Sequence, residues 1–112
     1  MCNTSEAMII LGEAVERSKE TFGSSFVNGY LYGSYARGDY DEESDVDIFL
    51  TVNQSDEAIR AHNKSLAKID SDLSLKYNVT VSVTVTSLEQ FNLYANISPF
   101  YRNIINEGIS YA

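Results

Sequence analysis

The sequence is poor in the residues that would mark it as secreted, membrane-bound or nucleic-acid-binding. Its one cysteine, Cys2, is incidental: it forms no disulfide framework or metal-thiolate site, which is typical of a reducing cytoplasm. No basic-then-apolar leader opens the chain, and no apolar run approaches about eighteen residues. Only 8 residues are Lys or Arg, against 16 Asp or Glu, and a net charge of -8 opposes phosphate neutralisation. We therefore expect a cytoplasmic protein with no membrane partner and no direct nucleic-acid binding.

The length of 112 residues fits one compact domain that buries about two-thirds of the surface of its unfolded chain. The sequence has no internal repeat, low-complexity tract or linker, so this domain is expected to cover residues 1–112. Helical and strand periods alternate along it in the order α, β, β, α, β, α. The predicted class is therefore α/β, in the broad sense that includes α+β folds.

Two long helices and two short ones are predicted from apolar periodicity and capping residues. Residues 5–22 place apolar side chains on one helical face and end before Gly23. A single long helix is expected over residues 55–77, beginning at a serine N-cap. Ser87 has the position of a capping box, and the pair Ser98-Pro99 starts a last helix.

Strands are predicted from β-prone runs and from alternation with a period of two. Residues 26–32 form a short β-prone run. In residues 45–52 the aliphatic side chains alternate with a second set that includes Phe49. Residues 79–86 alternate valine with serine and threonine and give the clearest strand pattern. A last short strand is expected at residues 109–111.

A short motif joins the first two predicted strands. The pair Gly33-Ser34 follows the first strand, and after the ten residues 35–44 the pattern Asp45-x-Asp47 begins the second. A tight turn at the glycine offers backbone N–H groups and a hydroxyl to phosphate oxygens. Carboxylates two apart in a strand point to the same face, with Cα atoms about 6.6 Å apart, so both can reach one cation. This combination is suited to a nucleoside triphosphate bound with a divalent cation.

Each half of the motif also has a simpler interpretation. A Gly-Ser pair is a common turn, and an Asp-x-Asp pair at the start of a strand can belong to a solvated loop. The acidic residues at positions 39–43 fit such a loop. Asp45 and Asp47 differ from them, because they begin a strand whose opposite face is apolar and their like charges repel. Magnesium takes one or two carboxylates together with substrate phosphates, and it is the cation that we expect here.

The segment from Gly33 to Leu50 closely resembles the signature of the polymerase-β-like nucleotidyltransferase superfamily: a Gly-Ser pair, a ten-residue gap and Asp-x-Asp on a strand. The small size resembles the minimal nucleotidyltransferase proteins, and the ending from Pro99 to Gly108 is similar to theirs. This resemblance implies a small mixed β-sheet with helices packed mainly on one side. It also implies transfer of a nucleoside monophosphate from ATP, or another triphosphate bound as its magnesium complex, with release of pyrophosphate.

Site residues follow from the resemblance position by position. Gly33 and Ser34 would hold the β- and γ-phosphates, and Asp45 and Asp47 would coordinate magnesium and carry catalysis. Arg37 has two interpretations that the sequence leaves open: it reaches a phosphate, or it neutralises the acidic loop. Much of the catalysis would come from positioning and from electrostatic stabilisation.

The sequence departs from the family pattern on the third strand. Active members usually carry a third carboxylate there, which helps to hold a second metal and takes the proton from the acceptor hydroxyl. Residues 79–86 contain no acid, and the nearest polar-face positions are Ser82 and Thr84, whose hydroxyls cannot act as a base near neutral pH. The base is therefore missing or borrowed, from Asp39, from Asp41, from water or from a partner protein. Triphosphate binding is better supported than turnover.

Aromatic residues near the motif and near the C-terminus have structural explanations. Tyr35, inside the phosphate turn, either packs on the nucleotide or covers the start of a helix. Phe91, Tyr94, Phe100 and Tyr101 gather near the C-terminus, where they are expected to form core or a partner surface.

Three functions are compatible with the motif and its missing acid. As the resemblance implies, the first is a minimal nucleotidyltransferase antitoxin that adenylylates a small helical HEPN-type ribonuclease toxin. The second is a nucleotide-binding module of weak activity that neutralises a basic partner by contact. The third is an antibiotic nucleotidyltransferase whose acidic loop attracts a cationic aminoglycoside, although 112 residues leave no room for the helical domain that such enzymes use to hold the acceptor.

Overall fold

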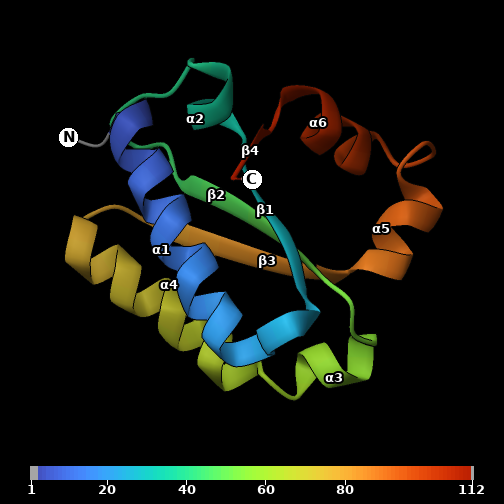
Figure 1. Cartoon of the computed structure of the whole chain (residues 1–112). Helices are drawn as coiled ribbons and strands as arrows, with labels where there is room; N and C mark the ends of the chain where they lie inside the picture. Colours follow the sequence, from blue (N-terminus) through green and yellow to red (C-terminus); the bar gives the residue numbers. More distant parts are fainter. Residues whose placement is uncertain (1–2, 112) are drawn as a thin grey trace.

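Figure 1 shows the computed structural model of the chain, which describes residues 3–111, so that Cys2 lies outside the described residues. No helix within that range combines the length and the apolar character needed to cross a bilayer. The elements in chain order are α1 (Thr4–Phe22), a 3-10 turn (Gly23–Ser25), β1 (Phe26–Tyr32), α2 (Ser34–Arg37), β2 (Val46–Val52), α3 (Asp56–Arg60), α4 (Asn63–Tyr77), β3 (Val81–Ser87), α5 (Leu88–Tyr94), α6 (Pro99–Glu107) and β4 (Ile109–Ser110).

The four strands form one mixed sheet of order β3-β2-β1-β4. β2 pairs in parallel with β3 and antiparallel with β1, and β1 pairs antiparallel with β4. The parallel pair needs a long crossover, which α3 and α4 supply. The expected mixed sheet is confirmed, and its inner strand β2 is the strand on which the Asp-x-Asp pattern was predicted.

Helices cover the two faces of the sheet unequally. The long helices α1 and α4 lie along one face, as expected, and bury Ile48 and Leu50 completely (Figure 1). Phe49 points to the opposite face and is equally buried, because Phe91 of α5 and Ile104 of α6 pack against it. The second set of β2 side chains is therefore not simply polar: part of that face is an aromatic core.

Capping residues set the helix ends, and those predicted at Gly23, Ser87 and Ser98-Pro99 are confirmed, whereas the Asn3 cap of α1 was not predicted. The Asn3 carboxamide oxygen accepts a hydrogen bond from the Glu6 N–H at 2.8 Å, and Gly23, at φ 59°, ends α1. The Ser87 hydroxyl accepts from the Gln90 N–H at 3.2 Å and starts α5, and the serine-proline pair starts α6 in the same way. These local signals need no tertiary contact, which explains why they are legible in sequence.

The predicted single helix over residues 55–77 is wrong, because the structure breaks it between α3 and α4. His62, at φ -100° and ψ 12°, leaves the helical path, and its ring packs edge-on against Phe22 at 5.0 Å. The break allows Ile59 to join Phe22 and Val52 in a separate small core cluster. A tertiary contact with the end of α1 therefore overrides the local helical period.

Side chains of α4 cap the outer edge of β3. The Ser74 hydroxyl accepts a hydrogen bond from the Val81 N–H at 2.9 Å, and the carboxylate of Asp70, one turn earlier, interacts with the Val83 N–H. Burial raises the pKa of Asp70, the Val83 N–H partly opposes that rise, and one carboxylate oxygen is buried without a partner. The cap therefore satisfies backbone groups of the strand at an electrostatic cost to the carboxylate.

The close packing of α1 on β1 depends on Gly29. A methyl group added there would lie 2.7 Å from Val15 Cγ2 and 3.0 Å from Leu50 Cδ2, so we expect Gly29→Ala to lower the free energy of unfolding by about 1–3 kcal/mol. Gly12→Ala is the matched control: its methyl would meet Tyr111 at 3.5 Å, and the helix should gain about 0.5–1 kcal/mol. Urea unfolding measures the free energy of unfolding of both variants. Equal stability of the two would show that α1 and β1 are not closely packed at Gly29.

The raised pKa of Asp70 predicts a pH-dependent contribution to stability. The folded chain holds this proton more tightly than the unfolded chain, whose Asp pKa lies near 3.8, so the contribution is present below that value and is lost as the pH rises through the folded pKa. The unfolding free energy of Asp70→Asn should therefore rise relative to wild type as the pH increases above about 4. For Asp72→Asn the unfolding free energy should instead fall relative to wild type as the pH rises toward about 4, because Lys68 and Arg17 lower the pKa of Asp72 below its unfolded value. Parallel curves for the three proteins would contradict this assignment.

Candidate functional site

The predicted phosphate turn lies at the end of β1, where Gly33 leads directly into α2. Gly33 has φ 77° and ψ -155°, and its carbonyl accepts hydrogen bonds from the Ala36 and Arg37 N–H groups at 3.2 and 3.1 Å. Gly38, at φ 85°, ends this single helical turn. Sequence reasoning predicted a turn but not the helix. Because the first N–H groups of a helical turn have no acceptor within it, Ser34 stands where backbone donors are available to an anion.

The two carboxylates lie beside this turn because of strand register. Asp47 pairs with Tyr32 across the β1–β2 ladder, and Gly33 is the next residue. A methyl group on Gly33 would lie 2.5 Å from Asp47 Oδ2, so the carboxylate occupies space that any other residue at position 33 would fill. Asp45, just before β2, is exposed, whereas Asp47 is half-buried. The structure therefore brings the five predicted site residues into two adjoining segments: Gly33, Ser34 and Arg37 lie in the turn and α2, and Asp45 and Asp47 lie at the start of β2.

The electrostatics of Asp47 fit a cation. Burial raises the pKa of Asp47, the nearby charge of Asp45 raises it further, and Arg37 lowers it in part. Within residues 3–111 there is no group of three or more His, Cys, Asp or Glu side chains that would hold a metal alone. Two adjacent carboxylates with room for substrate oxygens are the donor set that Mg²⁺ takes in nucleotide sites, so the residues present fit magnesium bound together with phosphates.

Arg37 is turned toward acidic neighbours in this structure. Its Nε lies 3.3 Å from Asp39 Oδ2, and its Nη1 lies 4.0 Å from Glu107 Oε2. The guanidinium is about half exposed, so each pair contributes little to stability. Of the two interpretations, neutralisation of the acidic loop is the one visible here, and phosphate binding by Arg37 stays a prediction.

Strand register shows where Ser82 and Thr84, the two positions considered for the missing third carboxylate, lie relative to β2. In the parallel β2–β3 ladder Asp47 pairs with Ser82, and Phe49 pairs with Thr84. Both of the polar-face positions singled out in the sequence therefore carry hydroxyls, and Ser82 is the one beside Asp47. Of the possible lenders in the loop, Asp39 is paired with Arg37.

Asp41, the other possible lender, is held within its own loop. Asp41 Oδ1 accepts hydrogen bonds from the Glu43 N–H at 2.9 Å and from the Ser44 hydroxyl at 3.3 Å. With Asp39 also engaged, neither loop acid is poised as a base in this structure.

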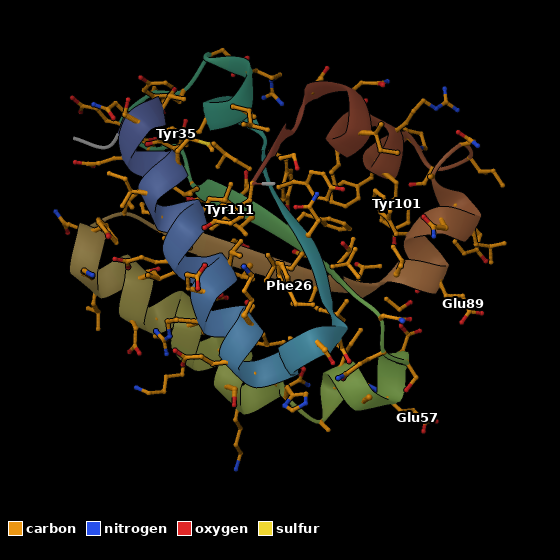
Figure 2. The ribbon with its side chains drawn as sticks, in the orientation of Figure 1. Phe26, Tyr35, Glu57, Glu89, Tyr101 and Tyr111 are labelled. Carbon is orange, nitrogen blue, oxygen red and sulfur yellow. The ribbon has the colours of Figure 1, made fainter. Side chains whose placement is uncertain are left out.

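Two tyrosines near the turn have roles that sequence reasoning missed or left open. Tyr32 is half-buried beside Asp47, and its hydroxyl is hydrogen-bonded to Thr84 across β2. Burial is the main cause of the raised pKa of Tyr32, and the charge of Asp47 raises this pKa further. That Tyr32 lies beside Asp47 follows only from the strand register, which cannot be read from the sequence. Tyr35 belongs to α2 and is fully buried in the core that α1 also lines (Figure 2). Its ring stacks on Tyr40 at 4.5 Å, so it covers the start of α2.

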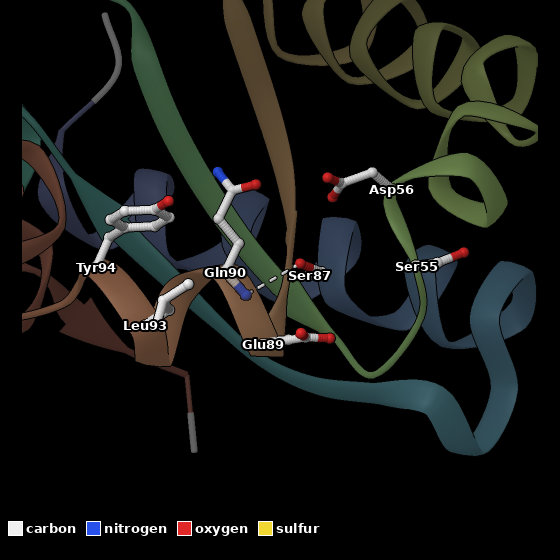
Figure 3. Close-up of a pocket in the computed structure, with 7 residues that line it drawn as sticks. All are labelled: Ser55, Asp56, Ser87, Glu89, Gln90, Leu93 and Tyr94. Carbon is white, nitrogen blue, oxygen red and sulfur yellow. Dashed lines mark hydrogen bonds between the residues drawn. The ribbon is translucent and has the colours of Figure 1, made fainter.

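The cavity in Figure 3 is not the phosphate site. It has a volume of about 310 Å³ and lies between the start of α3 and α5, beyond the carboxyl ends of β2 and β3. Asp56 and Glu89 both line it, and two carboxylates would repel a triphosphate. The carboxylate pair at the other end of β2 instead lies on an open surface beside the phosphate turn.

Comparisons with known proteins agree with this geometry. Residues 13–111 match the family described as "Nucleotidyltransferase domain". A Methanocaldococcus jannaschii protein, provisionally named a protein adenylyltransferase, is 36% identical over 96 residues, which cover 86% of this chain and 88% of that protein. A crystal structure of a protein provisionally named a nucleotidyltransferase, from Sulfolobus solfataricus, matches with a TM-score of 0.57 and 19% identity, covering 98% of this chain and 86% of that one.

A further solved structure has the same fold. It is a chain of a toxin–antitoxin crystallised with AMP-PNP, and it matches with a TM-score of 0.55 and 14% identity over 89% of this chain and 71% of that chain. At this identity the match establishes the fold and nothing more. It confirms the fold class predicted from the Gly33-to-Leu50 segment.

The contact between Gly33 and Asp47 predicts a specific sensitivity. Gly33→Ala forces a side chain into a backbone region that is essentially confined to glycine, at a cost of about 1–3 kcal/mol, and pushes the Asp47 carboxylate aside. We expect lower stability in urea unfolding and weaker binding in Mg-ATP titrations. Gly38→Ala is the matched control, since it also has positive φ but its methyl meets nothing within 4 Å. If both variants bind Mg-ATP equally, Gly33 does not position the carboxylate.

Proposed function

Because this chain belongs to the nucleotidyltransferase domain family, we propose that it transfers AMP from Mg-ATP to a hydroxyl group of a partner protein. The observation that carries the proposal is the contact of the phosphate turn with the carboxylate pair. A methyl on Gly33 would clash with the Asp47 carboxylate at 2.5 Å, so a triphosphate on the turn has its α-phosphate within reach of the carboxylate pair. Neither segment alone would specify a nucleotide; together they offer donors to phosphate and acceptors to its cation.

Each predicted site residue has a defined task in this reaction. The backbone at Gly33 and the hydroxyl of Ser34 hold the β- and γ-phosphates, and Asp45 and Asp47 hold magnesium. Magnesium, when bound there, supplies positive charge for the α-phosphate and the departing pyrophosphate. Arg37 is close enough to Asp47 to affect its pKa, so it can exchange its carboxylate partners for a phosphate. The acceptor oxygen attacks phosphorus in line as the bond to the pyrophosphate oxygen breaks.

Proton transfer is the weak point of this site. The acceptor hydroxyl must lose its proton, and Ser82, which stands beside Asp47, cannot take it near neutral pH. The proton therefore passes to water or to a group that the partner brings. General acid–base catalysis contributes typically about 100- to 10,000-fold, so turnover by this chain alone is expected to be slow.

We take the partner to be a small helical toxin of the HEPN type. Three observations support this choice: a structural neighbour is a toxin–antitoxin chain, a relative is provisionally named a protein adenylyltransferase, and this chain has a net charge of -8. A strongly acidic protein associates fastest with a basic one. A partner that brings its own base would also compensate for Ser82.

A second candidate function is neutralisation of the partner by contact alone. The specific observation in its favour is that β3 carries no carboxylate and that its residue beside Asp47 is Ser82. In this alternative the nucleotide site is retained for binding, and the partner is inhibited by association with the acidic surface.

Labelled ATP distinguishes transfer from contact. The chain is incubated with α-labelled ATP, magnesium and a small helical HEPN-type toxin, and the toxin is assayed for label and for toxicity. We expect label on the partner with wild type, and a loss on the order of 100-fold or more in Asp45→Asn and Asp47→Asn. Glu42→Gln, an exposed loop acid, should transfer normally. Full neutralisation by the two aspartate variants without label would instead establish contact as the mechanism.

A further inference from the structure

The sheet face beyond Asp47 is aromatic rather than polar. Phe49 follows Asp47 by two residues on the same face and is fully buried, and Tyr32 pairs with Asp47 from β1. Phe100, near the start of α6, packs on both of these residues. Its ring is edge-on to Tyr32 at 5.5 Å and 89°, and to Phe49 at 5.9 Å and 70°. The aromatic cluster therefore begins directly beside the carboxylate pair.

Phe100 is the exposed member of this cluster. Its relative exposure is 44%, whereas Phe91 and Phe49 are at 7% and 0%. The side chain is nevertheless held firmly, because the serine-proline pair fixes the start of α6 and the Tyr101 hydroxyl accepts a 2.6 Å hydrogen bond from Gln90 of α5. A rigidly held, exposed aromatic ring next to a candidate nucleotide site offers a flat apolar surface to a ligand.

Strand direction places the two parts of the site on opposite sides of Asp47. The chain runs from Asp45, just before β2, through Asp47 to Phe49, while Gly33 lies beyond the end of β1, near the start of β2. A triphosphate with its terminal phosphates on Gly33 directs its nucleoside away from the turn, along β2. The distance from Asp47 to Phe49 along the strand is about 6.6 Å, comparable to the span of a ribose, so the base arrives at Phe100.

We infer that Phe100 is the stacking platform for the base and that the site prefers purine over pyrimidine nucleoside triphosphates. The inference rests on the proposed function, because the phosphates must occupy the turn for the base to reach α6. Stacking uses the π-face, so a two-ring base gains more than a one-ring base, and ATP and GTP are bound alike. Tyr32, hydrogen-bonded to Thr84, contacts the Phe100 ring in a T-shaped arrangement.

Other exposed apolar residues of this region do not share this geometry. Leu93 and Ile97 are 64% and 70% exposed, and neither is aromatic. Tyr94 is 45% exposed but lines the acidic cavity of Figure 3, beyond the opposite end of β2. Among these exposed residues, Phe100 alone contacts both Tyr32, which pairs with Asp47, and Phe49, which follows Asp47 on the same face.

The test compares nucleotides with a ligand that has no base. Dissociation constants are measured by calorimetry in magnesium for ATP, GTP, CTP and inorganic tripolyphosphate. Wild type should bind ATP and GTP several-fold more tightly than CTP. Phe100→Ala should weaken ATP about tenfold, abolish the purine preference and leave tripolyphosphate unchanged. Phe100→Tyr should retain wild-type values, because the π-face is preserved.

Ile105→Ala is the matched control, since Ile105 lies on the same helix with 49% exposure and outside the aromatic cluster. Equal weakening of ATP and tripolyphosphate by Phe100→Ala would assign Phe100 a purely structural role and overturn the inference. Unchanged ATP binding in that variant, or no purine preference in wild type, would also overturn it. Failure of wild type to bind either ATP or tripolyphosphate would instead refute the proposed function.

Discussion

Burial of β2 on both faces is the constraint on which the rest of the structure depends. Every residue of β2 except Asp47 is buried, and the aliphatic side chains of one face are at 0% exposure. Full burial of an aliphatic side chain stabilises by about 1.5–3 kcal/mol, so four of them outweigh the cost of one half-buried carboxylate. The carboxylate is consequently held on a backbone that is hydrogen-bonded on both sides, and its position is set before any ligand arrives.

That rigidity explains why the site is precise although it lies on an open surface. Gly33 leaves room for Asp47 only because it has no side chain, and the register of β1 against β2 keeps the two in contact. Preorganised charge of this kind is suited to electrostatic catalysis, because the groups need not rearrange during the reaction. The same ladder extends to β3, where Ser82 supplies a hydroxyl instead of an acid. The fold therefore brings the turn and the carboxylate pair together, while β3 places a hydroxyl and no acid beside them.

The parts of the fold that local chemistry determines were predictable, and the parts that tertiary contacts determine were not. The C-terminus of α1 follows from Gly23 and the N-terminus of α5 from Ser87, because the conformations and hydrogen bonds of both residues are local. The break at His62 depends on Phe22, forty residues away in the chain, and no periodicity reveals it. In the site, residue types and spacing identified the turn and the carboxylates. The neighbours Tyr32 and Phe100 depend on register and helix docking, which a single sequence does not state.

The capped edge of β3 limits which insertions and deletions the sequence of α4 can accept. Ser74 and Asp70 face the strand's backbone because they are one helical turn apart on α4, and together they stand in for a fifth strand. A one-residue insertion or deletion before them would rotate both by about 100° and leave a bare strand edge, which is a template for pairing with another copy. α4 is mostly solvent-facing, and its exposed side is constrained chiefly by ion pairs such as Arg17–Asp72, but its length upstream of Asp70 is fixed by the sheet.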